Sequence, residues 1–121
     1  MNDLVNNQPT EIADEVYTGK VVRDGKVAVL YSPGFGAGWY SWERGTYGEE
    51  IIFDPMMVKY VEEDRYNDLQ QYVAMRYPDA YTGGLADLTV AWISEGTLFR
   101  IDEYDGNESI ETMADSTWIK A

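Results

Sequence analysis

The sequence predicts an α+β fold: an antiparallel β-sheet built from hairpins, with one long or two short helices at about residues 55–77 packed on one face. Three observations predict it. Two β-rich runs flank an Asp-Gly turn near the N-terminus, a helical pattern begins at an Asp-Pro pair, and further β-rich runs follow. Because the helical pattern falls in one stretch between strand pairs, helices are expected to cover one face of the sheet.

The first hairpin is predicted from residues 16–22 and 26–31, two β-rich runs on either side of Asp24-Gly25. Glycine adopts the positive φ that a tight turn needs, so Asp-Gly favours a hairpin here. Apolar residues fill successive positions of the second run, which predicts a strand buried on both faces. Residues 1–14 are polar and are expected to form a flexible N-terminal arm, leaving 15–121 as a single α+β domain.

The middle of the chain predicts a short strand and then helix. Residues 49–53 have the composition of a short strand. Asp54 and Pro55 suit the N-cap and the first position of a helix, and Pro78 ends the helical pattern. The pattern allows one long helix, or two helices of which the second is capped by Asp64.

Three more strands are predicted after the helices, over residues 88–93, 98–104 and 109–113. Residues 94–97 are expected to join the first two of these strands as a hairpin. Asp105-Gly106-Asn107 predicts another turn, after which the last strand pairs back.

The absence of histidine and cysteine excludes several classes of chemistry. It removes thiol nucleophiles, zinc-thiolate sites, disulfides and every catalytic arrangement that needs an imidazole. Adjacent glutamates do not converge on one bond, so paired-carboxylate catalysis is not favoured either. We expect no catalytic residue, no cofactor and no metal site, hence a protein that is not an enzyme.

The net charge of −13 bears on the partners of the protein. It arises from 22 acidic and 9 basic residues spread along the chain. Such a surface repels nucleic acid and anionic membranes, and it favours a basic partner, including the nucleic-acid groove of another protein. No stretch resembles a membrane span, and residues 1–14 lack the features of a secretory signal, so the cytoplasm is the expected compartment.

Acidic residues are candidates for such an interaction. Four of them surround Gly106, but Ile101 stands where a calcium loop would begin, so the EF-hand pattern fails. The candidate partner-binding residues are Asp102, Glu103, Asp105, Glu108, Glu62 and Glu63.

A glycine-rich, aromatic loop at residues 32–48 is the most unusual stretch of the chain. Its glycine spacing matches neither the dinucleotide-binding nor the P-loop pattern. The loop could pack its aromatic residues onto the sheet, contact a partner, or hold a small nucleotide-type ligand by stacking and arginine–phosphate contacts. The candidate ligand-binding residues are Gly36, Gly38, Trp39, Trp42, Arg44 and Arg100.

Two segments carry a resemblance: YSPGFGAGWYSW at 31–42 and GTLFRIDEYDGNE at 96–108. Both resemble segments of small proteins of tailed bacteriophages and prophages. The resemblance implies expression inside a bacterial host and a non-catalytic interactor, such as an inhibitor of host defence, and it assigns no functional residue. We therefore expect an acidic protein that binds a host protein with a basic surface. The alternative is a binder that sequesters a nucleotide-type signal.

Overall fold

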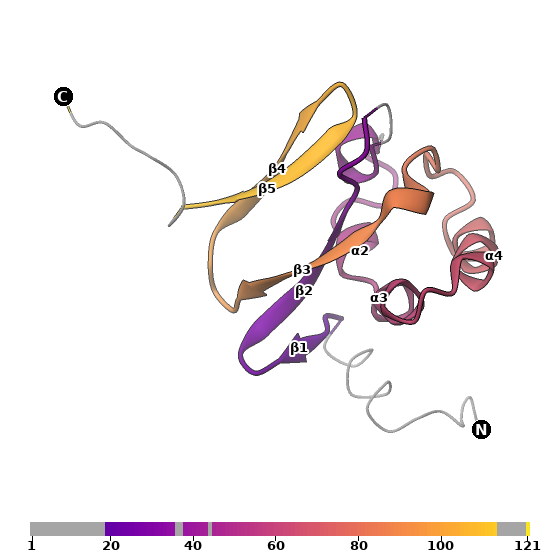
Figure 1. Ribbon diagram of the computed structural model, residues 1–121, viewed down its shortest axis with the longest axis horizontal. Coiled ribbons are helices and arrows are strands. Elements are labelled where there is room, and N and C mark those ends of the chain that lie inside the picture. Colours follow the sequence, from indigo (N-terminus) through magenta and orange to yellow (C-terminus); the bar gives the residue numbers. More distant parts are fainter. Residues whose placement is uncertain (1–18, 36–37, 44, 114–120) are drawn as a thin grey trace.

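The computed structural model describes residues 19–35, 38–43, 45–113 and 121. It has an α+β fold, as predicted, with all strand pairs antiparallel (Figure 1). The three strands of the first sheet, in the order β1-β2-β3, are β1 (Val22–Arg23), β2 (Lys26–Tyr31) and β3 (Thr89–Ser94). The second sheet consists of β4 (Phe99–Tyr104) and β5 (Asn107–Thr112). The helices are α2 (Glu50–Phe53), α3 (Pro55–Glu62) and α4 (Tyr66–Arg76), with 3₁₀ turns η1 (Tyr40–Trp42) and η2 (Leu85–Asp87).

The first hairpin forms at Asp24-Gly25, as predicted. Both turn residues have positive φ, 52° and 77°, and Arg23 is paired with Lys26 across them. The strand at 26–31 is confirmed, but β1 is much shorter than predicted. Residues 16–18 of that prediction, and the arm at 1–14, lie outside the described residues.

The prediction that residues 94–97 join two strands of one hairpin is wrong. A turn is present, because the Thr97 N–H donates to the Ser94 carbonyl at 3.0 Å. However, β3 pairs over its whole length with β2, whereas β4 pairs with β5 through the predicted turn at Asp105-Gly106. The apolar face of β4 packs near α2 instead. The ring of Phe99 on β4 meets the ring of Phe53 on α2 edge to face, with ring centroids 6.3 Å apart. The sheet predicted as one therefore forms two.

Two helices, α3 and α4, follow Asp54, so the alternative of one long helix over residues 55–77 is wrong. Asp64 has a φ of 57°, a value that cannot continue a helix, and it does not cap α4 as proposed. The strand predicted at 49–53 is wrong, because residues 50–53 form α2. Ile51 and Ile52 are both buried, and a short apolar run does not distinguish a strand from a buried helical turn.

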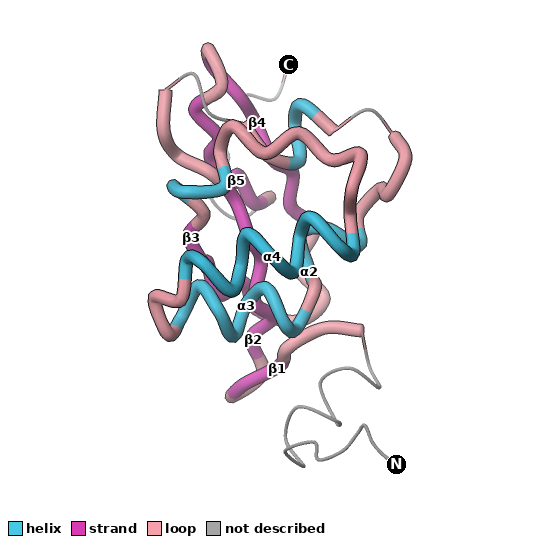
Figure 2. The backbone as a smooth tube through the Cα atoms, turned by 90° about the vertical axis from the view of Figure 1, so that its right-hand side faces the viewer, coloured by secondary structure: helices cyan, strands magenta, loops and turns pink. Residues whose placement is uncertain are grey.

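The core surrounds β2. Ala28, Val29 and Leu30 are all fully buried, so both faces of this strand are covered, as predicted. Figures 1 and 2 show α3 and α4 on one side of β2 and β3, while the β4–β5 hairpin lies on the other side. The acidic candidates on α3 are thereby separated from those on the hairpin.

Asp54 begins α3 and also joins it to α4. Its Oδ1 accepts hydrogen bonds from the backbone N–H groups of Met56 and Met57, at 2.9 and 3.2 Å, as expected of an N-cap. Its Oδ2 accepts the hydroxyls of Tyr72 and Tyr77, at 2.7 and 2.5 Å. Burial, and then the Asp54 carboxylate, raise the pKa of both tyrosines above the ordinary value of 10.0.

These raised tyrosine pKa values predict a loss of stability at alkaline pH. Above pH 10 the unfolded chain releases tyrosine protons that the folded chain retains, so stability present below pH 10 is lost as the pH rises. Each retained proton lowers the free energy of unfolding by about 1.4 kcal/mol per pH unit. Urea unfolding between pH 9 and 11 should show a shallower decline for Tyr77→Phe than for the wild type. The exposed Tyr104→Phe serves as control, and equal slopes for all three proteins would contradict the assignment.

Candidate functional site

The glycine-aromatic loop is organised by one buried carboxylate. Glu108, on β5, is 1% exposed. Its Oε1 accepts the backbone N–H of Ser32 at 2.9 Å. Its Oε2 accepts the N–H groups of Trp39 and Ser41, both at 2.8 Å, and the Ser41 hydroxyl at 2.6 Å. The Glu108 N–H in turn donates to the Ser32 carbonyl at 2.8 Å, which joins the hairpin to the end of β2.

This arrangement corrects the interpretation of Glu108 as part of an acidic surface. Its carboxylate binds the backbone N–H groups of Ser32, Trp39 and Ser41 inside the same chain. A second glutamate acts similarly further along the loop, where the Glu43 carboxylate accepts the N–H groups of Gly45, Tyr47 and Gly48. Glutamates of the chain thus occupy many of the loop's donors.

Two glycines permit the close packing around this carboxylate. Gly38 has a φ of 88°, a conformation that side chains rarely adopt. A Cβ added to Gly84 would lie 2.2 Å from the Gly38 carbonyl oxygen and 2.6 Å from Ser32 Oγ. The positive φ therefore accounts for Gly38, and the close approach of the Gly38 carbonyl accounts for Gly84.

The described residues among those proposed to hold a ligand have different surroundings. Trp39 is a core residue, 1% exposed, and its indole N–H donates to the Ile51 carbonyl at 2.9 Å. Trp42 is half-buried against Tyr81, with ring centroids 5.1 Å apart. Arg100 lies on β4 and is exposed. Gly36 and Arg44 lie outside the described residues.

Arg100 is held by carboxylates of the neighbouring strand positions. It contacts Glu111 at 2.6 Å, across the strand pair, and Asp102, two residues along β4, at 3.3 Å. The bond to Glu111, followed by the negative charge of Asp102, raises the pKa of Arg100. The guanidinium group remains solvent-exposed and is fixed in direction.

The acidic candidates form two separate groups. Glu62 and Glu63 end α3 and bind basic side chains: Glu62 binds Arg23 at 2.9 Å, and Glu63 binds Lys59 and Arg65 at 3.0 and 2.8 Å. These bonds, that of Arg65 foremost, lower the pKa of Glu63. The β4–β5 hairpin, on the other side of the first sheet, carries the second group: Asp102, Glu103 and Asp105 (Figure 1).

Exposed aromatic residues beside the second acidic group were missed by the sequence analysis. Tyr104 is 76% exposed and Phe35 is 71% exposed, and their rings meet edge to face with centroids 6.4 Å apart. Tyr104 lies between Glu103 and Asp105. The sequence did contain a signal for the exposure of Tyr104, because it stands directly before the Asp105-Gly106 turn. The end of a hairpin has few core residues against which an aromatic ring could be buried.

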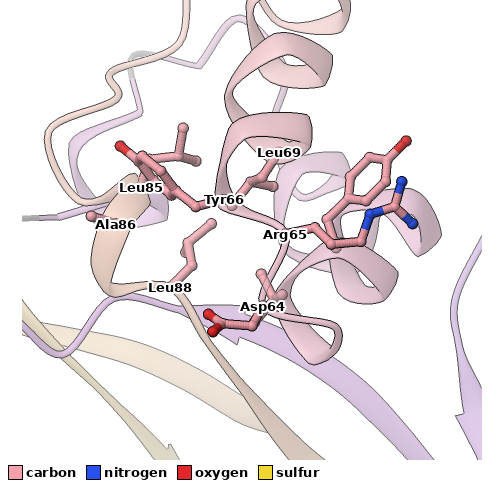
Figure 3. Close-up of a pocket in the computed structure, with 9 residues that line it drawn as sticks. Asp64, Arg65, Tyr66, Leu69, Leu85, Ala86 and Leu88 are labelled. Carbon is pink, nitrogen blue, oxygen red and sulfur yellow. The ribbon is translucent and has the colours of Figure 1, made fainter.

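Two of the clefts in the described part of the chain differ in volume and position. The smaller, about 140 Å³, lies at the turn between α3 and α4 and is lined on one side by Leu85 and Ala86 of η2. Figure 3 shows Leu69, Leu85 and Leu88 converging there while the Arg65 side chain extends away. A larger cleft of about 360 Å³ lies between α2 and β4.

Among the described residues, no group of three carboxylates is placed to hold a metal ion. Of the helices in the described ranges, none is long and apolar enough to cross a membrane. Comparisons with models of protein families, with curated proteins and with solved structures give no match to this chain.

Proposed function

We propose that this protein is a non-catalytic interaction protein that binds a basic surface of a host bacterial protein through the end of the β4–β5 hairpin. We define the hairpin tip as Phe35, Glu103, Tyr104 and Asp105. The observation that carries the proposal is the exposed aromatic pair flanked by carboxylates. The resemblance to small phage proteins favours a bacterial protein of the cytoplasm, such as a defence or nucleic-acid-handling protein, as the partner.

The aromatic pair supports protein binding. Large exposed apolar side chains often mark interaction surfaces, and tyrosine is enriched among the residues that contribute most to binding. Packing of the two rings against each other restricts both before any partner arrives. A partner would therefore bury apolar area at little cost in side-chain entropy.

The base of the hairpin is held rigidly, which also supports the proposal. Glu108 lies opposite Glu103 in the strand register, and its carboxylate binds the loop that carries Phe35. The Glu103 carboxylate accepts the Gly106 N–H at 2.6 Å, which fixes the turn itself. These contacts present the hairpin tip in one geometry, and preorganisation of this kind favours affinity.

The charge of the hairpin tip indicates the chemistry of the partner. Glu103 and Asp105 are both exposed, and they flank Tyr104 in the sequence. A partner arginine could pair with a carboxylate and stack on an aromatic face in one contact. The net charge of −13 would add long-range attraction to a basic surface.

Affinity capture from bacterial lysate tests the proposal when the wild type is compared with a variant that carries both Phe35→Ser and Tyr104→Ser. The wild type should retain a basic protein at low salt and release it at high salt. The variant should bind that protein at least about 30-fold more weakly, since loss of central aromatic contacts commonly costs about 2 kcal/mol or more. Met75→Ser, which removes another exposed apolar side chain from α4, should retain full binding. Equal retention by the hairpin-tip variant and the wild type would overturn the proposal.

A further inference from the structure

The strand β3 forms one outer edge of the first sheet and lacks the usual protection of a sheet edge. It pairs with β2 on one side only, and its six residues include no charged residue and no proline. By contrast, β1 at the other edge is two residues long, and β4 carries Arg100, Asp102 and Glu103. Short length, charge and proline are features by which proteins prevent edge strands from pairing with other chains. None of these features is present in β3.

The register of the first sheet shows which backbone groups of β3 point outward. The Glu95 N–H donates to the Gly25 carbonyl at 2.8 Å, so these two residues form a hydrogen-bonded pair at the end of the ladder. Hydrogen-bonded and non-hydrogen-bonded pairs alternate along antiparallel strands. Ala91 therefore directs its N–H and C=O groups toward β2, whereas Val90 and Trp92 direct theirs toward the open edge.

The outward backbone groups of Val90 and Trp92 are available for pairing. Within the described part of the chain, no other segment forms a backbone hydrogen bond with them. The next outward carbonyl, that of Ser94, already accepts the Thr97 N–H at 3.0 Å. The residues on either side of Ala91 thus offer two donors and two acceptors to a further strand.

We propose that β3 pairs antiparallel with β3 of a second copy of this chain, about a twofold axis at Ala91. In this register Val90 lies opposite Trp92 of the second copy, and the reverse pair is identical by symmetry. Four hydrogen bonds then satisfy the two donors and two acceptors of each copy. Each pair also places a β-branched side chain beside an aromatic ring, a combination that stabilises antiparallel strands.

A second copy is the occupant that this pattern favours. Residues 89–93 of one copy oppose residues 93–89 of the other, and none of them is charged, so no like charges meet within the paired strands. Elsewhere the two copies repel each other, because each carries a net charge of −13. Salt screens this repulsion, so dimerisation should strengthen with salt. Binding of a basic partner at the hairpin tip should weaken with salt, which distinguishes the two associations.

Sedimentation equilibrium and amide hydrogen exchange test the proposal on the purified protein. We expect reversible dimers with a Kd on the order of 100 µM, since the interface is small. The amides of Val90 and Trp92 should exchange about fourfold more slowly at about 1 mM protein than at about 20 µM. The Ala91 amide, which faces β2, should exchange at the same rate at both concentrations. A protein that stays monomeric at about 1 mM, or a dimer in which Val90 and Trp92 exchange unchanged, would overturn the proposal.

Proline at position 90 removes one outward donor from each copy. An edge strand tolerates proline where its N–H faces away from the sheet, so Val90→Pro should fold. We expect this variant to dimerise at least about tenfold more weakly than the wild type, because two of the four hydrogen bonds are lost. Val90→Thr keeps the N–H group and the β-branched shape, and it should dimerise as the wild type does. Equal Kd values for Val90→Pro and the wild type would contradict pairing through β3.

A single introduced cysteine tests the register without proline. The chain has no cysteine, so any disulfide in such a variant joins two copies. Ala91→Cys places the two thiols opposite each other at the twofold axis, at a separation that suits a disulfide. It should form cross-linked dimers at least about tenfold faster than Ser94→Cys, whose thiols lie away from the axis. Equal rates for the two variants would contradict the register.

Discussion

Replacing Glu108 with alanine is expected to lower the free energy of unfolding by about 4 kcal/mol. The substitution leaves three backbone N–H groups and one hydroxyl without their acceptor, at Ser32, Trp39 and Ser41. All lie in buried or half-buried surroundings, where water replaces the lost bonds poorly. Urea unfolding followed by tryptophan fluorescence would measure the change.

The matched control is Glu111→Gln, which removes one negative charge from the same strand. Glu111 lies at a partly exposed position and pairs with Arg100, so its loss should cost about 1 kcal/mol or less. Formate can enter the space left by the Glu108 side chain, so it should partly restore the stability of Glu108→Ala but not affect the control. A loss below about 1 kcal/mol for Glu108→Ala would show that the carboxylate does not organise the loop.

The second large effect is expected at Asp54. We expect Asp54→Ala to lower the free energy of unfolding by about 3 kcal/mol, because an N-cap and the acceptor of two tyrosine hydroxyls are lost together. Asp54 is 6% exposed, and Tyr77 is 1% exposed, so little water is available to compensate. The melting temperature and urea midpoint of the variant would measure this loss.

Asp68→Ala provides the comparison for Asp54. Asp68 binds Arg65 at 2.8 Å on the surface of α4, and removing an exposed ion pair should cost about 1 kcal/mol or less. Similar losses for the two variants would contradict the role of Asp54 in joining α3 to α4.

Turn and cap chemistry explains the parts of the fold that the sequence predicted well. Asp-Gly pairs mark both hairpin turns, and Asp54-Pro55 marks the start of α3, because these residues favour the local backbone angles whatever surrounds them. The choice between a strand and α2, and the partner of β3, depend on packing of distant segments. Local patterns do not contain that information.

Local sequence patterns also did not predict the burial of Glu108. A glutamate directly after an Asp-Gly-Asn turn is typical of an exposed position. Strand alternation was the overlooked signal, since Ile110 points to the core and Glu108, two residues earlier, must share its face. The acceptor is needed only because Ser32, Trp39 and Ser41 pack there, and the contact with Ser41 spans 67 residues of chain.

The most direct test of the proposed function is the association rate constant of the captured basic protein, measured by stopped-flow fluorescence at increasing ionic strength. The comparison is between the wild type and a variant with Glu103→Gln and Asp105→Asn. These changes remove two charges from the hairpin tip but keep an oxygen acceptor at each position. We predict that the wild-type rate falls steeply with salt and that the variant associates more slowly with a weaker salt dependence. Equal rates and equal salt dependence for the two proteins would contradict binding through the acidic hairpin tip.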